Sequence, residues 1–398
     1  MLIRDHTILF TEACPLNCKY CYIQTDPIYG SAKQVTLEDI IAFIEKIKEK
    51  DSQDKNIKTQ LTFTGGEPFL YWDWIKIIME KYGNDFNYSF NTSGYCFTEE
   101  ILQFLSKFDS VSFVLSIDGT EKLTNYLRPV KENPYKVGYY KKLKEIIPTL
   151  LYYFPSTPYR IIVNQRYVDL LHECYLDAQR LGFKYFTFLL DLRTRPEELR
   201  SGEKPWSEES SKILQEQMNL ICLEIIEGFK DGVDKPQIVE INKIINFLFN
   251  KKPYSPDNLP CQLFAERDLT SAYDNMSKTD NCMGSTYPNL KDAYQDLIKA
   301  YNEQNGKCKL DKNCPVFEYC ANYCCPKNSL EFRGGFFNFD ILECTVNKIC
   351  YNSAIKILQA CNIYCPESKL YTRFLNRFNY EEKEEVLVPW EQTFVDSL

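Results

Sequence analysis

The stretch that decides the fold is CPLNCKYC, residues 14–21, which places Cys14, Cys18 and Cys21 on one short loop. It directly follows an apolar segment, residues 7–10, that reads as a β-strand. Three thiolates so close together can grip a cube-shaped iron–sulfur cluster and leave one iron without a protein ligand. Structural zinc sites are closed by four ligands, so zinc fits this spacing poorly. The loop therefore predicts a cluster with one iron open to a small molecule.

The composition supports a metal-binding enzyme. The chain has 398 residues, with 17 cysteines but only two histidines, His6 and His172. Clustered cysteines in a long chain without a signal segment are expected to stay reduced and to bind metal. So few histidines argue against a His-centred catalytic triad. The length suggests a catalytic domain with a second module.

Charge and hydropathy exclude two classes of protein. The net charge of -8 argues against a dedicated nucleic-acid binder. No apolar run reaches the roughly 20 residues that cross a bilayer, and residues 1–6 do not resemble a signal peptide. We therefore expect no nucleic acid, no membrane, and a cytoplasmic location.

The first two hundred residues alternate between strand and helix patterns. Strands are expected at 7–10, 60–64, 87–91, 111–116, 159–163 and 185–190. Helices are expected at 37–48, 72–82, 99–108, 139–152 and 168–181, and further on at 207–229 and 239–249. Strands that alternate with helices usually pair in parallel, so the pattern predicts a parallel barrel or open sheet.

The C-x3-C-x2-C spacing after the first strand, with Tyr20 before the last cysteine, resembles the radical S-adenosylmethionine (SAM) superfamily. The resemblance implies that Cys14, Cys18 and Cys21 hold a [4Fe–4S] cluster. Its open iron would bind the amino and carboxylate groups of SAM, and Tyr20 would lie near the adenine.

Further segments at strand ends resemble the SAM-binding motifs of this superfamily. Gly65-Gly66-Glu67-Pro68 follows the second strand, where glycines allow close backbone approach and a carboxylate can accept from the SAM ammonium. The remaining expected SAM contacts are Asn91, Ser116, Asp118, Arg128 and Val163. The resemblance assigns Ser116 and Asp118 to the SAM ribose and carboxylate, and Arg128 to the carboxylate. Val163, at the end of the fifth strand, is expected to pack on the adenine. Residues of these types are also common in ordinary turns and strands that bind no ligand.

A second group of cysteines resembles the SPASM extension of radical SAM enzymes, which implies two auxiliary [4Fe–4S] clusters. By the resemblance, one takes Cys261, Cys282 and Cys324, and the other takes Cys308, Cys314, Cys320 and Cys344. The family's C-x2-C is Asp311-x2-Cys314 here, so either Cys308 or Asp311 supplies a ligand, and thiolate is the softer one. A module that binds zinc is the alternative.

These patterns predict four regions. They are a partial (β/α)6 TIM-like barrel at 1–205, a helical bridge at 206–255, a loop-rich, cysteine-rich SPASM-like domain at 256–355, and a helical tail at 356–398.

The resemblance implies an enzyme that cleaves SAM reductively to a 5′-deoxyadenosyl radical. That radical would abstract hydrogen from a ribosomally made precursor peptide, which then forms a thioether or carbon–carbon crosslink. Met283 stands where sulfatase-maturing relatives carry an aspartate, which disfavours formylglycine formation, the first alternative. The second is a non-catalytic zinc-binding interaction protein.

The expected partners are SAM, the peptide or protein substrate, and an external electron donor such as flavodoxin or ferredoxin. The chain starts almost at the first strand, so a separate leader-binding protein is also expected, or leader contacts from residues 193–255. The general base is not identified.

Overall fold

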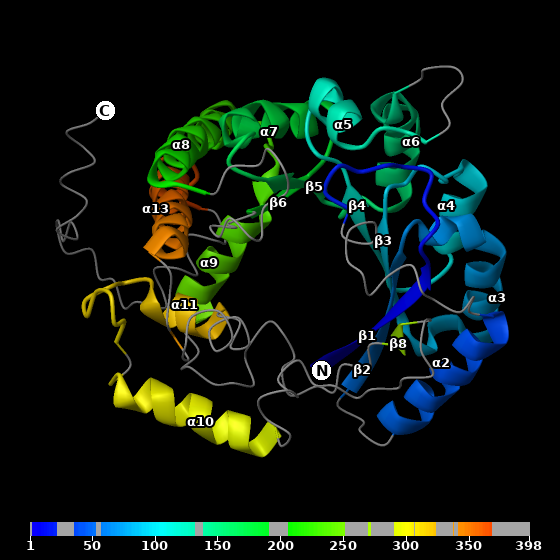
Figure 1. Cartoon of the computed structure of the whole chain (residues 1–398). Helices are drawn as coiled ribbons and strands as arrows, with labels where there is room; N and C mark the ends of the chain where they lie inside the picture. Colours follow the sequence, from blue (N-terminus) through cyan, green and yellow to red (C-terminus); the bar gives the residue numbers. More distant parts are fainter. Residues whose placement is uncertain are drawn as a thin grey trace.

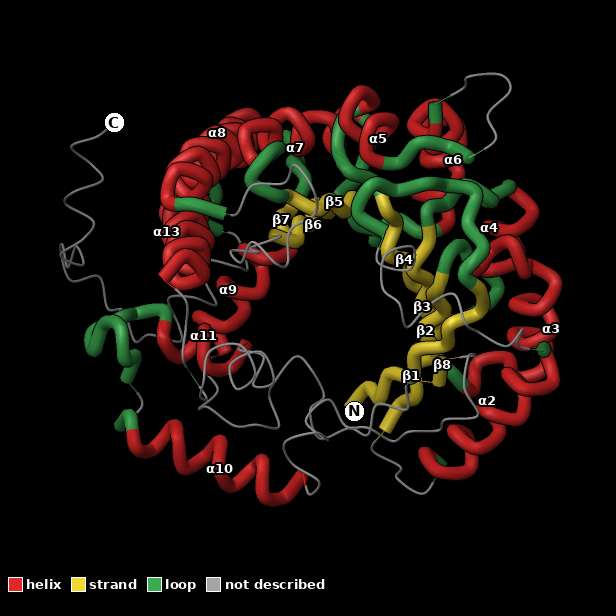
Figure 2. The backbone as a smooth tube through the Cα atoms, viewed as in Figure 1, coloured by secondary structure: helices red, strands yellow, loops and turns green. Residues whose placement is uncertain are grey.

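One curved parallel sheet organises the computed structural model (Figure 1, Figure 2). The structure describes residues 2–21, 36–52, 57–131, 138–190, 206–250, 270–271, 290–305, 307–323, 337 and 341–367. Within them the strand order is β7-β6-β5-β4-β3-β2-β1-β8, and every neighbouring pair is parallel. This confirms the predicted α/β barrel-like fold.

Six strands carry the sheet and two short ones lie at its edges. They are β1 (Leu2–Thr11), β2 (Ile57–Gly65), β3 (Asn87–Thr92), β4 (Val111–Ser116), β5 (Tyr159–Val163), β6 (Tyr185–Leu190), β7 (Gln237–Ile238) and β8 (Thr270–Ser271). The helices between them are α2 (Leu37–Asp51), α3 (Trp72–Tyr82), α4 (Glu99–Leu105), α5 (Glu121–Leu127), α6 (Tyr139–Tyr153) and α7 (Leu171–Arg180). Later helices are α8 (Glu208–Asp231), α9 (Val239–Asn250), α10 (Leu290–Glu303), α11 (Phe317–Tyr323) and α13 (Ile341–Tyr364).

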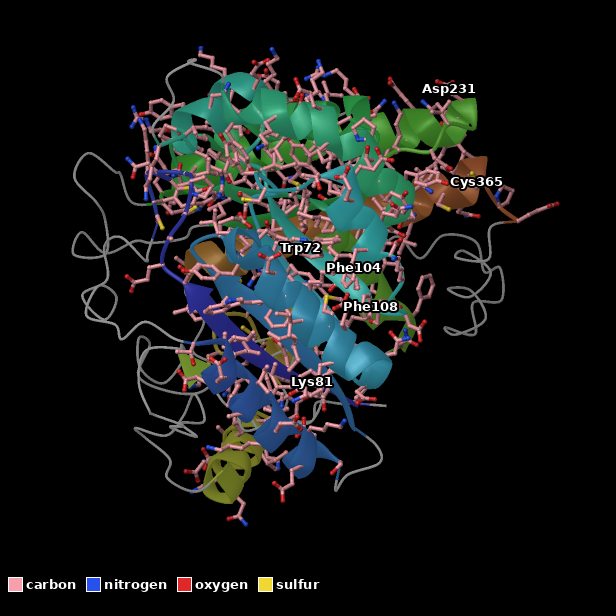
Figure 3. The ribbon with its side chains drawn as sticks, turned by 90° about the vertical axis from the view of Figure 1, so that its right-hand side faces the viewer. Trp72, Lys81, Phe104, Phe108, Asp231 and Cys365 are labelled. Atoms are coloured by element: carbon pink, nitrogen blue, oxygen red, sulfur yellow. The ribbon has the colours of Figure 1, made fainter. Side chains whose placement is uncertain are left out.

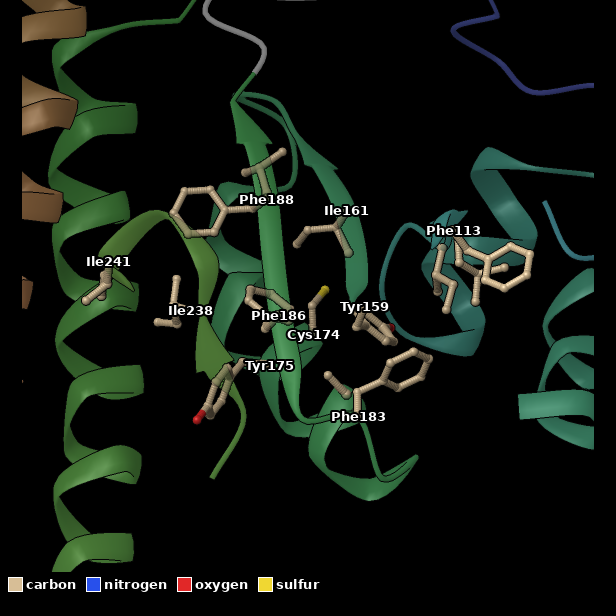
Figure 4. Packing of buried hydrophobic residues seen from close by; sticks show 14 of the residues in the cluster. Phe113, Tyr159, Ile161, Cys174, Tyr175, Phe183, Phe186, Phe188, Ile238 and Ile241 are labelled. Carbon is tan, nitrogen blue, oxygen red and sulfur yellow. The ribbon is translucent and has the colours of Figure 1, made fainter. Parts of the chain in front are cut away.

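Successive side chains of a strand point to opposite faces of the sheet, and the two faces of this sheet differ in polarity. One face is apolar and buried against the helices, as in Tyr159, Ile161 and Phe186 (Figure 4). The opposite residues of the same strands, among them Arg160 and Thr187, are partly exposed on the inner face. The core thus lies between sheet and helices, and a polar lining is left inside the curve.

The helices close the outer side with aromatic contacts. Trp72 of α3 meets Phe104 of α4 edge-on at 5.3 Å between ring centroids, and Phe104 lies 5.4 Å from Phe108 (Figure 3). Such pairs add to the stabilisation from burial alone.

The C-terminal part differs from the sequence prediction. The sequence predicts a loop-rich domain up to residue 355 and a helical tail from residue 356, whereas α13 begins at Ile341 and runs through that boundary. It packs on α8 and α9, and its buried Ile349, Ala354 and Leu358 belong to the same core as the barrel. A helix that buries apolar residues on a neighbouring pair of helices is favoured over a loop because burial outweighs weak local signals.

The described helices include none with the length and apolarity needed to cross a membrane.

Candidate functional site

The cysteine loop leaves the carboxyl end of β1 and is tied to the segment after α5. The backbone bonds run from Asn17 N to Pro129 O (2.8 Å), from Lys19 N to Leu127 O (2.9 Å) and from Lys131 N to Pro15 O (2.8 Å). Leu16, only 1% exposed, forms an antiparallel bridge with Val130. Because bonds hold the loop on both sides of Cys18, the three thiols have a fixed place at the strand ends. Local sequence patterns do not reveal this role of residues 127–131.

The three thiols are partly exposed, and Cys14 and Cys18 accept hydrogen bonds at sulfur. Burial raises the pKa of the Cys14 thiol to about 11, and the Leu16 N–H donates to its sulfur at 3.4 Å. Burial raises the pKa of Cys18 as well, while Arg128, with Nη1 at 3.6 Å from the sulfur, opposes that rise. Iron–sulfur clusters commonly take such donors to sulfur from the protein. The donor set therefore fits a cluster.

The thiols do not converge on one point. Among the described residues, no group of three or more His, Cys, Asp or Glu side chains lies close enough to hold a metal ion. The donor set and the fixed loop support a cluster, and the thiols do not form a closed cage.

Gly65 and Gly66 serve the cysteine loop itself. Gly66 N donates to Thr11 O at 2.6 Å, and Glu67 N donates to Ala13 O at 2.8 Å. A Cβ on Gly66 would lie 2.1 Å from Ala13 O, and one on Gly65 would lie 2.3 Å from Thr11 O. Only glycine allows this approach. We predicted that the glycines give a ligand room; the structure adds that they let the thiol loop lie on β2.

Glu67 is fully buried, and both oxygens of its carboxylate accept hydrogen bonds from the protein itself. It accepts from Thr92 Oγ1 (2.6 Å), Ser93 N (2.8 Å), Ser93 Oγ and Phe69 N (3.3 Å). Burial raises its pKa, and these bonds work against the rise. Both oxygens are thus engaged, so the geometry supports a brace between β2 and β3 in place of the predicted contact with the SAM ammonium.

Asp118 and Arg128 form a buried pair that reaches the thiol loop. Arg128 Nε lies 2.6 Å from Asp118 Oδ2, and Arg128 Nη2 lies 3.3 Å from Oδ1. The Tyr20 hydroxyl donates to the same carboxylate, and the guanidinium lies 5.2 Å from the Tyr20 ring centre. Through Arg128 Nη1 the pair also touches Cys18. Three residues expected near SAM are therefore brought together with one of the predicted iron ligands.

The other expected SAM contacts lie at strand ends with different surroundings. Asn91 Nδ2 donates to Thr64 Oγ1 at 3.4 Å, and Ser116, half-buried, accepts at its carbonyl from the Tyr139 hydroxyl at 2.8 Å. Val163 is 2% exposed and belongs to the core against the helices. Its side chain faces away from the inner surface, so the expected packing of that side chain on adenine is not supported.

Four of the seven cysteines of the second group can be placed. Cys308, Cys314, Cys320 and Cys344 are described, whereas Cys261, Cys282, Met283 and Cys324 lie outside the described residues. Burial raises the pKa of Cys314 and of Cys344, and the negative charge of nearby Cys308 raises each further. These thiols thus share one neighbourhood between the turn at 308–314 and α13.

Asp311 is engaged in that neighbourhood. Its Oδ2 lies 3.5 Å from Lys348 Nζ on α13, and its Oδ1 accepts from Asn313 N at 3.0 Å. Asn347 Nδ2 also lies 3.5 Å from Cys320 Sγ. The second cysteine region is therefore tied to α13 by polar contacts beside its thiols.

Comparisons with known proteins agree with this geometry. A model of the radical SAM superfamily matches residues 8–157, which hold the thiol loop, the Gly65-Gly66 turn and the Asp118–Arg128 pair. The solved structure "Native anSMEcpe with bound AdoMet" superposes with a TM-score of 0.64, covering 91% of this chain and 100% of that one at 17% identity. At that identity the likeness shows the fold.

Curated relatives match over a limited segment. The chain is 30% identical over 139 residues to the radical SAM cyclopropyl synthase TigE of Paramaledivibacter caminithermalis, which is 31% of this chain and 29% of TigE. It is 34% identical over 145 residues to the 7-carboxy-7-deazaguanine synthase of Methanocaldococcus jannaschii, covering 33% and 53%. It is 26% identical over 122 residues to the sporulation killing factor maturation protein SkfB of Bacillus subtilis, covering 31% and 28%.

These matches span between about a quarter and about half of each relative's length. The relatives' names include different chemistries, so these matches do not fix a substrate. The family model, the barrel fold and the three-thiol loop agree, so residues 8–157 form a radical SAM superfamily domain.

Proposed function

We propose that Cys14, Cys18 and Cys21 bind a [4Fe–4S] cluster whose open iron binds SAM. The observation that carries this is the thiol loop itself, which is tied to residues 127–131 and touched by Arg128. When bound, the cluster would supply the electron that cleaves SAM to methionine and a 5′-deoxyadenosyl radical.

The chain's own residues would hold this site in place. Gly65 and Gly66 seat the loop on β2, and Glu67 fixes the turn that follows. Asp118 orients Arg128, whose Nη1 side faces Cys18 and so is suited to bind the SAM carboxylate beside the cluster. Tyr20, held by Asp118, would border the adenine.

We propose a peptide or protein as the substrate. The hydrogen atom that it loses would convert the radical to 5′-deoxyadenosine, and loss of a second electron and a proton would allow a thioether or carbon–carbon crosslink to close. Support comes from the SPASM-like cysteine spacing and from Met283 in place of the aspartate of sulfatase-maturing relatives. The SkfB relative is named as a maturation protein, and a solved form of anSMEcpe carries a bound peptide.

We further propose an auxiliary cluster on Cys308, Cys314, Cys320 and Cys344. Cys308 and Cys314 lie near enough to Cys344 for their negative charges to raise its pKa, beyond the larger effect of burial, and this proximity supports the cluster. Asp311 pairs with Lys348, which favours Cys308 as the ligand. A second auxiliary cluster on Cys261, Cys282 and Cys324 stays a sequence prediction, as do the electron donor and a leader-binding partner.

The direct test is to reconstitute the protein with iron and sulfide without oxygen, reduce it with dithionite and add SAM. We expect 5′-deoxyadenosine and methionine in equal amounts. A colourless protein that retains zinc and leaves SAM intact would contradict the proposal and favour the non-catalytic alternative.

The product class needs a second measurement on candidate peptides encoded beside the enzyme. A crosslinked peptide loses two hydrogen atoms and does not react with a hydrazide. A formylglycine product carries an aldehyde and does react, so hydrazide labelling separates the crosslinking proposal from the sulfatase-type alternative.

A further inference from the structure

A row of polar side chains crosses the inner face of three neighbouring strands. Ser116 of β4 is in register with Arg160 of β5, and Arg160 is in register with Thr187 of β6. Glu240, in the first turn of α9, extends the row, because its Oε1 accepts from the Thr187 hydroxyl at 2.6 Å. Apolar residues alternate with these on the helix-facing side, so the row is part of the polar lining.

Arg160 stands out in this row because nothing described engages its guanidinium. Among the described residues, no hydrogen bond and no ion pair within 4 Å reaches it. Glu240 attracts it, but that carboxylate already accepts from Thr187 and from Phe188 N (3.4 Å). The half-buried position lowers the pKa of Arg160, since burial disfavours its charge.

Arg128 makes the contrast clear. Its guanidinium lies beside Cys18 in the predicted SAM site, and two of its nitrogens are taken by Asp118. A charged group that loses water without gaining a partner costs free energy. A guanidinium presents paired donors that match a carboxylate, so Arg160 is suited to a carboxylate that enters the barrel.

We infer that Arg160, flanked by Ser116 and Thr187, is a carboxylate-binding subsite on the inner face of the barrel. The inference rests on the proposed function and names one chemical feature of its ligand. The carboxylate comes from an acidic residue or the C-terminus of the peptide, because Arg128 already stands beside Cys18 for SAM. SAM is the other source of the same chemistry.

The experiment uses Arg160→Gln and Arg160→Glu in the reconstituted, SAM-loaded protein, with Arg180→Gln as the matched control. Arg180 is an arginine on the outer side of α7 with 62% of its side chain exposed. The probe is a displayed library of random peptides selected for binding. We expect the wild type and Arg180→Gln to enrich Asp or Glu at one position, or a free C-terminus. Arg160→Gln should lose that preference, and Arg160→Glu should favour Lys or Arg.

A second arm identifies the source of the carboxylate. The affinity for SAM and for decarboxylated SAM is measured by equilibrium dialysis. If SAM binding falls about 10-fold in Arg160→Gln while decarboxylated SAM binding does not change, the subsite binds the SAM carboxylate. If SAM binding is unchanged and the acidic preference is lost, the ligand is the peptide.

The inference is overturned if Arg160→Gln changes neither the peptide preference nor SAM affinity. It is also overturned if the wild type shows no acidic preference and the variant binds SAM as the wild type does. The iron content and SAM cleavage of the wild type are measured in the same preparation. Their loss would refute the proposed function, whereas a normal wild type with an unaltered variant would refute the Arg160 subsite alone.

Discussion

Arg128 Nε lies 2.6 Å from Asp118 Oδ2, and the two side chains are almost completely buried beneath the thiol loop. The pair links the end of β4 to the segment that holds residues 15–19. A buried cation whose partner is removed keeps its desolvation cost, so each half of such a pair depends on the other.

Asp118→Asn is therefore expected to destabilise the protein by about 3–5 kcal/mol, because the guanidinium of Arg128 loses its counter-charge. The variant should show a lower thermal midpoint and less iron after reconstitution. The control is Asp85→Asn, which breaks an exposed pair with Lys48 and should cost about 0–1 kcal/mol. Equal midpoints for the two variants would mean that the buried pair does not support the loop.

Gly66→Ala tests whether close packing of the thiol loop on the end of β2 is needed for cluster binding. The added methyl would lie 2.1 Å from Ala13 O, so the loop must move away from β2. We expect a marked loss of bound iron with the barrel still folded by circular dichroism. Gly83→Ala is the control, since its Cβ meets nothing within 4 Å and only its φ of 54° is unfavourable. That variant should bind iron like the wild type; a matching loss in both would point to general instability.

Glu67→Gln separates a structural brace from a SAM ligand. The amide NH2 cannot accept from donors that now bond to one carboxylate oxygen, and we expect destabilisation by about 2–4 kcal/mol. The thermal midpoint of the cluster-free protein should fall, since the cost does not depend on SAM. The control is Glu80→Gln on the surface of α3. An unchanged midpoint together with weaker SAM binding would support the originally predicted contact with SAM.

Cys308→Ala and Asp311→Ala distinguish the two candidate ligands of the auxiliary cluster. We expect Cys308→Ala to lower the iron content by about one cluster, because a thiolate is the softer ligand. Asp311→Ala removes a pairing partner of Lys348 and should retain the iron. Iron analysis and electron paramagnetic resonance of the reduced proteins report this. The reverse pattern would make Asp311 the ligand.

Much of the barrel was predictable because its signals are local. Strands β4, β5 and β6 and helix α3 have the predicted bounds, since alternation or a 3.6-residue period marks each of them. Helix α5 was missed because Glu121–Leu127 is short and weakly periodic. Helix α13 was missed because its stability comes from packing on α8 and α9, which a local pattern does not encode.

The site was predictable by motif and less so by role. The spacing of Cys14, Cys18 and Cys21 identified the family segment that the comparisons confirm. The cysteine spacing did not reveal that the Glu67 carboxylate accepts hydrogen bonds from Thr92 and Ser93. Nor did it reveal the pairing of Asp118 with Arg128, because such contacts join residues that are not neighbours in the chain. Arg160 carries no motif; only the strand register places it beside Ser116.

The most direct test of the central claim compares the wild type with a variant in which Cys14, Cys18 and Cys21 are all alanine. The control is Cys365→Ala, which removes a thiol at the end of α13. After anaerobic reconstitution and reduction, the amount of 5′-deoxyadenosine formed from SAM is measured. We predict product from the wild type and the control and none from the triple variant. Continued formation of 5′-deoxyadenosine by the triple variant would contradict the assignment.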